Sequence, residues 1–90
     1  MQFEKVSKSF LDHLQIERAL SANSIAAYKR DLAKFQAFLS GQSLDLERVS
    51  EEDIVKFEVD QKTAGLSLAS INRSTSALKT FYKYLAREYS

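Results

Sequence analysis

The sequence predicts an all-α domain of four helices, and three observations support this. Pro is absent from the 90 residues, and Gly occurs only at Gly41 and Gly65. A β-domain of this size would need more turn residues than that. Ala, Leu, Lys and Glu, which favour helix, are common, and apolar residues recur at helical spacing in four segments.

The first helix is expected over about residues 3–18. Its apolar positions Phe3, Val6, Phe10 and Leu14 fall at i, i+3, i+7 and i+11, which places them on one stripe of a helix. The stripe predicts a helix that packs one face against a core.

The second helix is expected to begin after Ser21, a good N-cap residue. Its apolar residues recur at steps of 3, 4, 3 and 4: Ile25, Tyr28, Leu32, Phe35 and Leu39. This is the most regular amphipathic pattern in the chain. We expect Gly41 to occupy the C′ position that ends the helix.

Residues 42–49 are predicted to form an ordered connection whose leucines, Leu44 and Leu46, fill one edge of the core. The run 50–53, Ser-Glu-Glu-Asp, resembles a capping box with acids in the first turn of a helix. The third helix should therefore begin after Ser50 and stop at Gly65. Ile54, Val55 and Phe57 are its apolar residues, and its second half is polar, which predicts a thin apolar stripe.

The fourth helix is predicted from the N-cap Ser67 to about residue 88. The residues expected to point inward are Leu68, Ile71, Leu78, Phe81 or Tyr82, and Leu85. The opposite face carries Asn72, Arg73, Ser76, Lys79, Lys83 and Arg87. The glycines lie at the predicted helix ends and the serines at the predicted helix starts, so the cap residues and the apolar periodicity predict the same helix boundaries.

Length and composition exclude several classes of protein. A chain of 10.2 kDa is expected to form one domain, residues 1–90. There is no Cys, which excludes disulfides and thiolate sites. No apolar run is long enough to span a membrane, and the N-terminus has no signal-peptide pattern. We therefore expect a cytoplasmic protein that has no membrane partner.

No catalytic centre, metal site or cofactor site is expected in these residues. The single histidine, His13, lies on a helix that is interpreted as structural. Helix capping and solvated charge explain the acidic run at Glu51, Glu52 and Asp53 more simply than a metal or an acid–base pair does. No nucleotide-binding, metalloprotease or redox motif is present.

The charge is unevenly distributed although its sum is only +1. Residues 21–41 and 66–90 are basic, whereas residues 42–65 carry a net charge of −4. Helices with polar and basic faces can enter the DNA major groove, where Arg and Asn suit base edges and Ser and Lys suit phosphates. Candidate DNA-binding residues from helical geometry are Asn23, Ser24, Ala27, Arg30, Lys34, Ser70, Asn72, Arg73, Ser76, Lys79 and Lys83. An ordinary solvated surface is the alternative at this stage.

Two long motifs resemble the core-binding domain of tyrosine site-specific recombinases. Residues 20–39 match a pattern Leu-Ser-x-x-Thr-x-x-x-Tyr-x-x-Asp-Leu-x-x-Phe, with Ser24 replacing Thr. Residues 65–85 match the fourth-helix pattern that contains Gly-Leu-Ser and Ile-Asn-Arg, with Ser70, Thr75 and Lys79 replacing Thr, Leu and Arg. Residues 49–57 also fit. The resemblance covers nearly the whole chain and is similar to Xer-type recombinases and to phage or transposon integrases.

The resemblance implies a specific fold and role. It implies a SAM-like bundle of two crossed helical hairpins whose second and fourth helices lie on the major groove of double-stranded DNA. Family contacts carry over to Asn23, Ser24 and Ala27 on the second helix and to Ala69 and Arg73 on the fourth. The family's chemistry resides in a C-terminal catalytic domain of the same protein, which is absent from this chain. We therefore expect one domain of a longer recombinase, with no nucleophile among Tyr28, Tyr82, Tyr84 and Tyr89.

Two features of the resemblance leave questions open. Family members usually have Leu where Glu58 and Gln61 stand, which puts the packing of the third helix in doubt. Neighbouring protomers in a DNA-bound tetramer are a possible partner, with Phe3, Phe10 and Leu11 as the expected contacts. The alternative functions are a SAM-like protein–protein interaction module and, less well supported, a free-standing transcription regulator.

Overall fold

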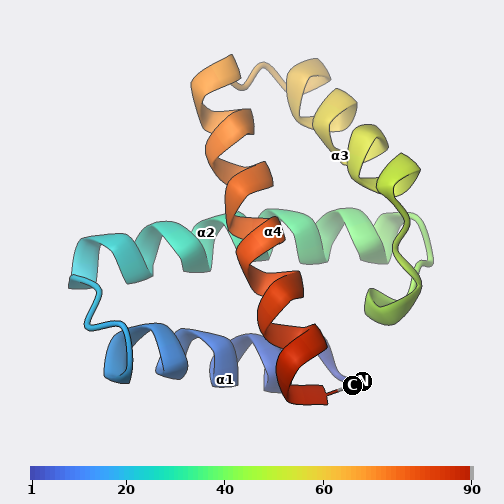
Figure 1. Ribbon diagram of the computed structural model, residues 1–90. Helices are drawn as coiled ribbons and strands as arrows, with labels where there is room; N and C mark the ends of the chain where they lie inside the picture. Colours follow the sequence, from blue (N-terminus) through green and yellow to red (C-terminus); the bar gives the residue numbers. More distant parts are fainter. Residues whose placement is uncertain (90) are drawn as a thin grey trace.

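Two helical hairpins cross to form the domain in the computed structural model, which describes residues 1–89 (Figure 1). The first pairs α1 (Phe3–Ile16) with α2 (Ala22–Gly41), and the second pairs α3 (Glu51–Thr63) with α4 (Leu68–Tyr89). A short 3₁₀ turn, η1 (Leu46–Arg48), precedes α3. Helix α4 lies across the first hairpin and contacts both of its helices. The predicted all-α bundle of two crossed hairpins is confirmed.

Each of the four helices contributes one fully buried phenylalanine to a single core. These are Phe10, Phe35, Phe57 and Phe81, each with no exposed surface. The ring centroids of Phe10 and Phe81 lie 5.1 Å apart, and those of Phe35 and Phe57 lie 5.3 Å apart. Aromatic pairs at such distances stabilise beyond the area that they bury. The core therefore joins both hairpins.

Three apolar side chains lie differently from one of the places predicted for them. Phe10 is wholly inside the core, as its position on the stripe of the first helix predicts, so the expectation that it contacts neighbouring protomers is wrong; Leu11 packs against the core at its edge. Val55, which was counted among the apolar residues of the third helix, and Leu68, which was expected inward, are 54% and 66% exposed. Both lie near helix starts, where an error of one residue in the helix phase turns a side chain by about 100° around the helix axis. Within residues 1–89, no helix combines the length and the apolar character needed to cross a membrane.

The predicted helix starts are confirmed in atomic detail. Ser21, Ser50 and Ser67 each accept a hydrogen bond on Oγ from the backbone N–H three residues later, at 3.2 Å. At Ser50 the arrangement is a complete capping box, because the Asp53 carboxylate accepts in return from the Ser50 backbone N–H at 2.9 Å. Such caps satisfy N–H groups that a helix start otherwise leaves unpaired.

The helix ends agree with the sequence at one glycine and differ at the other. Gly65 has φ +93° and lies two residues after the end of α3, where Leu66 N–H donates to the Gln61 carbonyl in a Schellman turn. Gly41, in contrast, is the last helical residue of α2, and the left-handed position belongs to Ser43, with φ +50°. The prediction for Gly41 was wrong because the turn closes where Leu44 can pack on the core. Helix α1 ends at Ile16, two residues earlier than predicted.

The Asp53 capping box is expected to lose its stabilising effect on α3 at acid pH. Hydrogen bonds from Ser50, first from its backbone N–H and then from its hydroxyl, hold the pKa of Asp53 below its ordinary value of 3.8. Because the pKa of Asp53 is lower in the folded than in the unfolded protein, the ionised carboxylate stabilises the fold. This stabilisation is complete above the unfolded-state pKa and is lost as the pH falls through the folded-state pKa. We expect the melting-temperature difference between wild type and Asp53→Asn to narrow from about pH 5 to about pH 3. Thermal circular dichroism at several pH values checks this, and a constant difference would contradict it.

Helix α3 packs on α4 although Glu58 and Gln61, where the resemblance leads us to expect Leu, are polar. Glu58 is half-buried, and its Oε2 accepts a 2.8 Å hydrogen bond from the Thr75 hydroxyl of α4. Gln61 is buried, and its Oε1 has no hydrogen-bond partner among the described residues. The contact between α3 and α4 thus includes a polar pair, Glu58 with Thr75.

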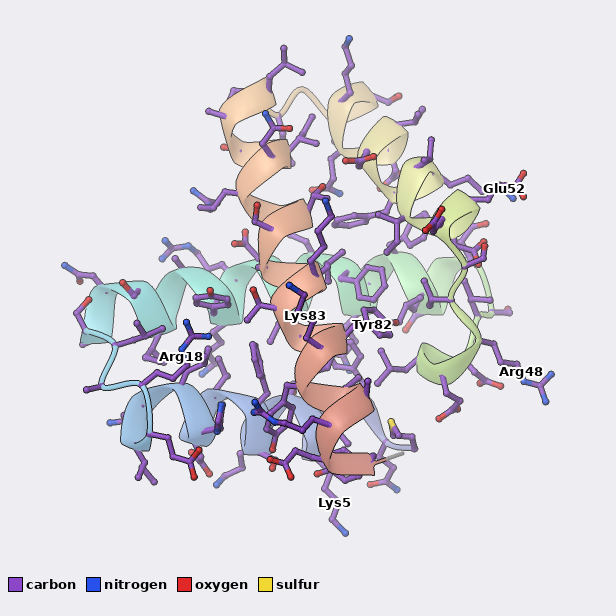
Figure 2. All side chains as sticks on the ribbon, viewed as in Figure 1. Lys5, Arg18, Arg48, Glu52, Tyr82 and Lys83 are labelled. Carbon is purple, nitrogen blue, oxygen red and sulfur yellow. The ribbon has the colours of Figure 1, made fainter. Side chains whose placement is uncertain are left out.

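The connection between the hairpins is ordered, as predicted. Leu46 is buried and Leu44 packs against the core. The hydroxyl of Tyr82 donates a 2.7 Å hydrogen bond to the Leu46 carbonyl, and Figure 2 shows the ring reaching from α4 toward this segment. Burial, followed by the nearby carboxylates of Glu47 and Asp53, raises the pKa of Tyr82. This phenol therefore stays protonated and ties α4 to η1.

Candidate nucleic-acid interface

The twelve predicted DNA-binding residues all lie at the surface, on α2 and α4. On α2 these are Asn23, Ser24, Ala27, Arg30 and Lys34, and on α4 they are Ala69, Ser70, Asn72, Arg73, Ser76, Lys79 and Lys83. None of them is buried. The crossing of the two helices brings only part of this set together, because α4 passes over α2 at one point (Figure 1).

A hollow of about 220 Å³ at the α2–α4 crossing holds four of the predicted residues. The residues that line it are Ser24, Ala27, Tyr28, Asp31, Arg73, Ser76 and Ala77. Small side chains dominate the lining, so the space remains open above the helix backbones. We call this site the crossing hollow, and it is the place where the predicted residues converge.

A buried carboxylate, Asp31, organises the crossing hollow from below. It is 1% exposed and accepts hydrogen bonds from Arg73 Nε at 3.3 Å and from Arg73 Nη2 at 3.2 Å. The hydroxyl of Ser74, also buried, donates to the same carboxylate at 2.9 Å. Lys34 Nζ lies 3.7 Å away. A buried carboxylate with several donors is the arrangement that makes such burial tolerable.

Arg73 is therefore fixed at one edge and open at the other. Its hydrogen bonds to Asp31, and then the attraction of that charge, raise its pKa. About half of the side chain remains accessible, with 48% of its surface exposed. A guanidinium has five N–H donors, and Asp31 takes only two of them. The remaining donors can bind an external acceptor.

The two lysines of the set on α4, Lys79 and Lys83, border different hollows along that helix. Lys79 lines a groove between α3 and α4, with Glu51 and Glu58 on the opposite wall. Lys83 borders a groove against α1 that also contains Arg18 and Arg87. Figure 2 shows Lys83 on α4 at the front of the view and Arg18 to its left, between α1 and α2, whereas Arg48 and Glu52 point outward at the right edge.

Two residues at the helix crossing, Asp31 of the crossing hollow and the buried Ser74 bonded to it, were not identified as organisers by the sequence reasoning. Asp31 entered only as a match to the motif and Ser74 not at all, although helical spacing could have placed both of them inward. Asp31 lies one turn from Tyr28 and from Phe35, on the same stripe. Ser74 lies three residues after Ile71 and four before Leu78, which are both buried. Two polar residues that face each other from inward stripes of two helices indicate a buried pair.

Three of the four tyrosines, Tyr28, Tyr82 and Tyr84, make structural contacts within the domain. The Tyr84 hydroxyl pairs with Ser9 Oγ at 2.6 Å, and Tyr82 binds the Leu46 carbonyl. The Tyr28 ring packs edge-on against Phe10, with centroids 5.8 Å apart. His13 lies between Glu17 and Arg87, with its Nδ1 2.8 Å from the Glu17 carboxylate and its Nε2 3.3 Å from Arg87 Nη2. Each of these groups has a packing role.

Comparison with known proteins agrees with this architecture. The family described as "Phage integrase, N-terminal SAM-like domain" matches residues 8–89. Tyrosine recombinase XerC of Lacticaseibacillus casei is 37% identical over 81 residues, which cover 88% of this chain and 27% of that protein. Tyrosine recombinase XerD of Rickettsia prowazekii is 40% identical over 79 residues, which cover 88% of this chain and 25% of that protein.

A further relative spans nearly the same region. Tyrosine recombinase XerD of Mycobacterium tuberculosis is 35% identical over 89 residues, covering 90% of this chain and 29% of that protein. The chain thus spans about a quarter of the length of the curated relatives that it matches. No solved structure matches it. The extent of the family match shows that the chain belongs to the N-terminal SAM-like domain family of phage integrases, whose relatives include the Xer tyrosine recombinases.

Proposed function

We propose that residues 1–90 are the core-binding domain of a tyrosine recombinase. The domain binds the major groove of the recombination site through α2 and α4 and positions a C-terminal catalytic domain that cleaves and rejoins DNA strands. The chain itself supplies no catalytic residue. Its partners are double-stranded DNA, the catalytic domain and, in a DNA-bound tetramer, neighbouring protomers. Because its proposed partner is DNA, we propose that the protein acts in the cytoplasm.

The crossing hollow is the observation that carries this proposal. It brings residues from both motifs of the recombinase pattern to one open surface, with Arg73 presented from a buried anchor. The acidic residues of the segment 42–65 are mostly on η1 and α3. The candidate basic residues lie instead on α2 and α4, the two helices that cross at the hollow. A surface with basic, amide and hydroxyl groups on two helices suits phosphate and base-edge contacts.

A salt-dependent NMR titration tests the DNA-binding surface. Labelled domain is titrated with a short DNA duplex at low and then at high salt. We expect shifts concentrated on residues 21–34 and 67–83 that fade as salt rises. About four phosphate contacts would give a slope of log K against log salt near −3.6. Shifts spread evenly over the four helices, or shifts indifferent to salt, would contradict this surface.

Lys79→Ala provides a localised version of the same test. Removing this charge is expected to weaken DNA binding several-fold and to lower the salt slope by about 1. Lys56→Ala is the matched control, because it removes the same charge from an exposed position on α3. Equal losses in the two variants would show that net charge alone governs binding. Fluorescence anisotropy with a labelled duplex measures both.

One observation favours the second candidate, a protein–protein interaction module. Val55 and Val59 lie one turn apart on α3 and are 54% and 59% exposed, so they present two adjacent apolar side chains at the surface. In that case the titration would show no DNA-dependent shifts, and line broadening would grow with protein concentration. The two functions are therefore separated by one set of spectra.

A further inference from the structure

Arg73 lines the crossing hollow, and one edge of its guanidinium is held by Asp31. Asp31 takes the Nε and Nη2 edge, with donor–acceptor distances of 3.3 and 3.2 Å. This side-on edge is one of the two edges by which arginine makes paired hydrogen bonds. The three N–H groups that remain lie on the outer end of the side chain, which is 48% exposed. Arg73 is thus fixed in orientation before any ligand arrives.

The surroundings of that outer end suit an anionic oxygen. Ser24 Oγ accepts a hydrogen bond from Ser21 Oγ at 3.1 Å, which leaves the Ser24 hydroxyl hydrogen free to donate outward. Ser24 also lies in the first turn of α2, where the helix dipole is positive. Ser76 provides a second hydroxyl, and Ala27 and Ala77 leave room for a tetrahedral group. Donors and small residues surround a space of about 220 Å³.

We propose that the crossing hollow holds one backbone phosphate of the DNA, and that Asp31 is a positioning residue that fixes Arg73 for this contact. The inference rests on the proposed DNA-binding function and deepens it. It changes the role expected of Arg73 from the sequence, because the hydroxyl groups of Ser24 and Ser76 and the start of α2, which line the same hollow, suit an anionic oxygen. A phosphate contact sets the register of the domain on DNA without selecting sequence.

The direction in which an Asp31 substitution changes DNA affinity distinguishes a positioning role from a simple effect of net charge. Asp31→Asn removes a negative charge beside the proposed phosphate, so net charge alone would strengthen DNA binding. If Asp31 acts by orienting Arg73, the same substitution weakens binding, because the guanidinium is released to many rotamers. The two explanations thus predict opposite changes in affinity.

The experiment measures anisotropy of four labelled 20-base-pair duplexes of different sequence with the 90-residue chain at about 50 mM salt, the low end of the range over which such contacts are resolved. Asp31→Asn is expected to weaken binding severalfold, and Arg73→Ala about tenfold with a salt slope lower by about 1. Asp12→Asn is the matched control. It removes the same charge from an exposed carboxylate on α1, paired only with Lys8, and should leave affinity unchanged or slightly higher.

Sequence independence is the second readout. The losses for Asp31→Asn and Arg73→Ala should be the same factor on all four duplexes, because every duplex presents phosphates. A loss that varies among the duplexes would assign Arg73 to a base edge and overturn the phosphate site. Tighter binding by Asp31→Asn, as for Asp12→Asn, would overturn the positioning role. Absence of binding by the wild type to any duplex would instead overturn the proposed function, and this inference with it.

Arg73→Lys keeps the test decisive if Asp31→Asn does not fold. Lysine retains the charge but cannot form the two-pronged contact with Asp31. We expect its affinity to fall on all four duplexes while the salt slope stays that of the wild type. Unchanged affinity would show that charge alone matters at this position. Circular dichroism spectra and melting curves of every variant confirm that folded protein is compared.

Discussion

Replacing Phe35 by alanine is expected to lower the free energy of unfolding by about 3–5 kcal/mol. Phe35 has no exposed surface, and its ring lies 5.3 Å from that of Phe57 on α3 and 6.2 Å from that of Tyr82 on α4. The Phe3 ring of α1 lies 6.4 Å away. One side chain of α2 thus contacts all three other helices. The cavity left by alanine would be shared by both hairpins, and neither could close it by moving alone.

Chemical denaturation followed by circular dichroism measures this loss. Domains of this size have about 5–15 kcal/mol of stability, so the variant would be near the limit of folding. Val59→Ala is the control, because that valine is 59% exposed and its truncation should change stability by less than about 0.5 kcal/mol. A Phe35→Ala protein within about 1 kcal/mol of this control would show that α3 and α4 do not depend on the shared core.

The sequence predicts the fold well because periodicity and capping act locally. Each N-cap serine lies beside the backbone N–H that it accepts from, so Ser21, Ser50 and Ser67 could be identified from their neighbours alone. Where the prediction failed, a contact with residues distant in the sequence determined where the helix ends. The turn after α2 closes at Ser43 and not at Gly41, because Leu44 reaches the core there. Local propensity carries no information about that packing.

The candidate site was only partly predictable for the same reason. Helical geometry gave the exposed residues of each helix, and the resemblance added Ala69, but neither shows where two helices cross. The contact between Asp31 and Arg73 joins residues 42 positions apart, so it depends on the angle at which α4 passes over α2. Core side chains such as Phe35 and Tyr82 pack between these two helices, so the angle is a property of the whole core and not of one segment. The sequence therefore indicated the face of each helix, and the crossing determined which residues meet.

Asp31→Ala is expected to lower the free energy of unfolding by about 3 kcal/mol, the second large effect in this domain. The carboxylate is 1% exposed and accepts from Arg73 twice and from Ser74 once. Its removal eliminates charge-assisted hydrogen bonds and leaves the Ser74 hydroxyl, also 1% exposed, without its acceptor. Arg73 can turn to water, because half of its side chain is already exposed, and this limits the loss.

The double variant Asp31→Ala/Ser74→Ala tests this account of the loss. If part of the cost comes from the orphaned Ser74 hydroxyl, removing that hydroxyl as well should recover about 1 kcal/mol. Asp12→Ala is the surface control, with an expected cost below about 1 kcal/mol because its pair with Lys8 is exposed. Urea titrations of the four proteins give the comparison. A double variant less stable than Asp31→Ala would mean that Ser74 stabilises the helix crossing by packing. In that case the orientation of Arg73 by Asp31 would also depend on Ser74, because Ser74 would help to hold α4 in place across α2.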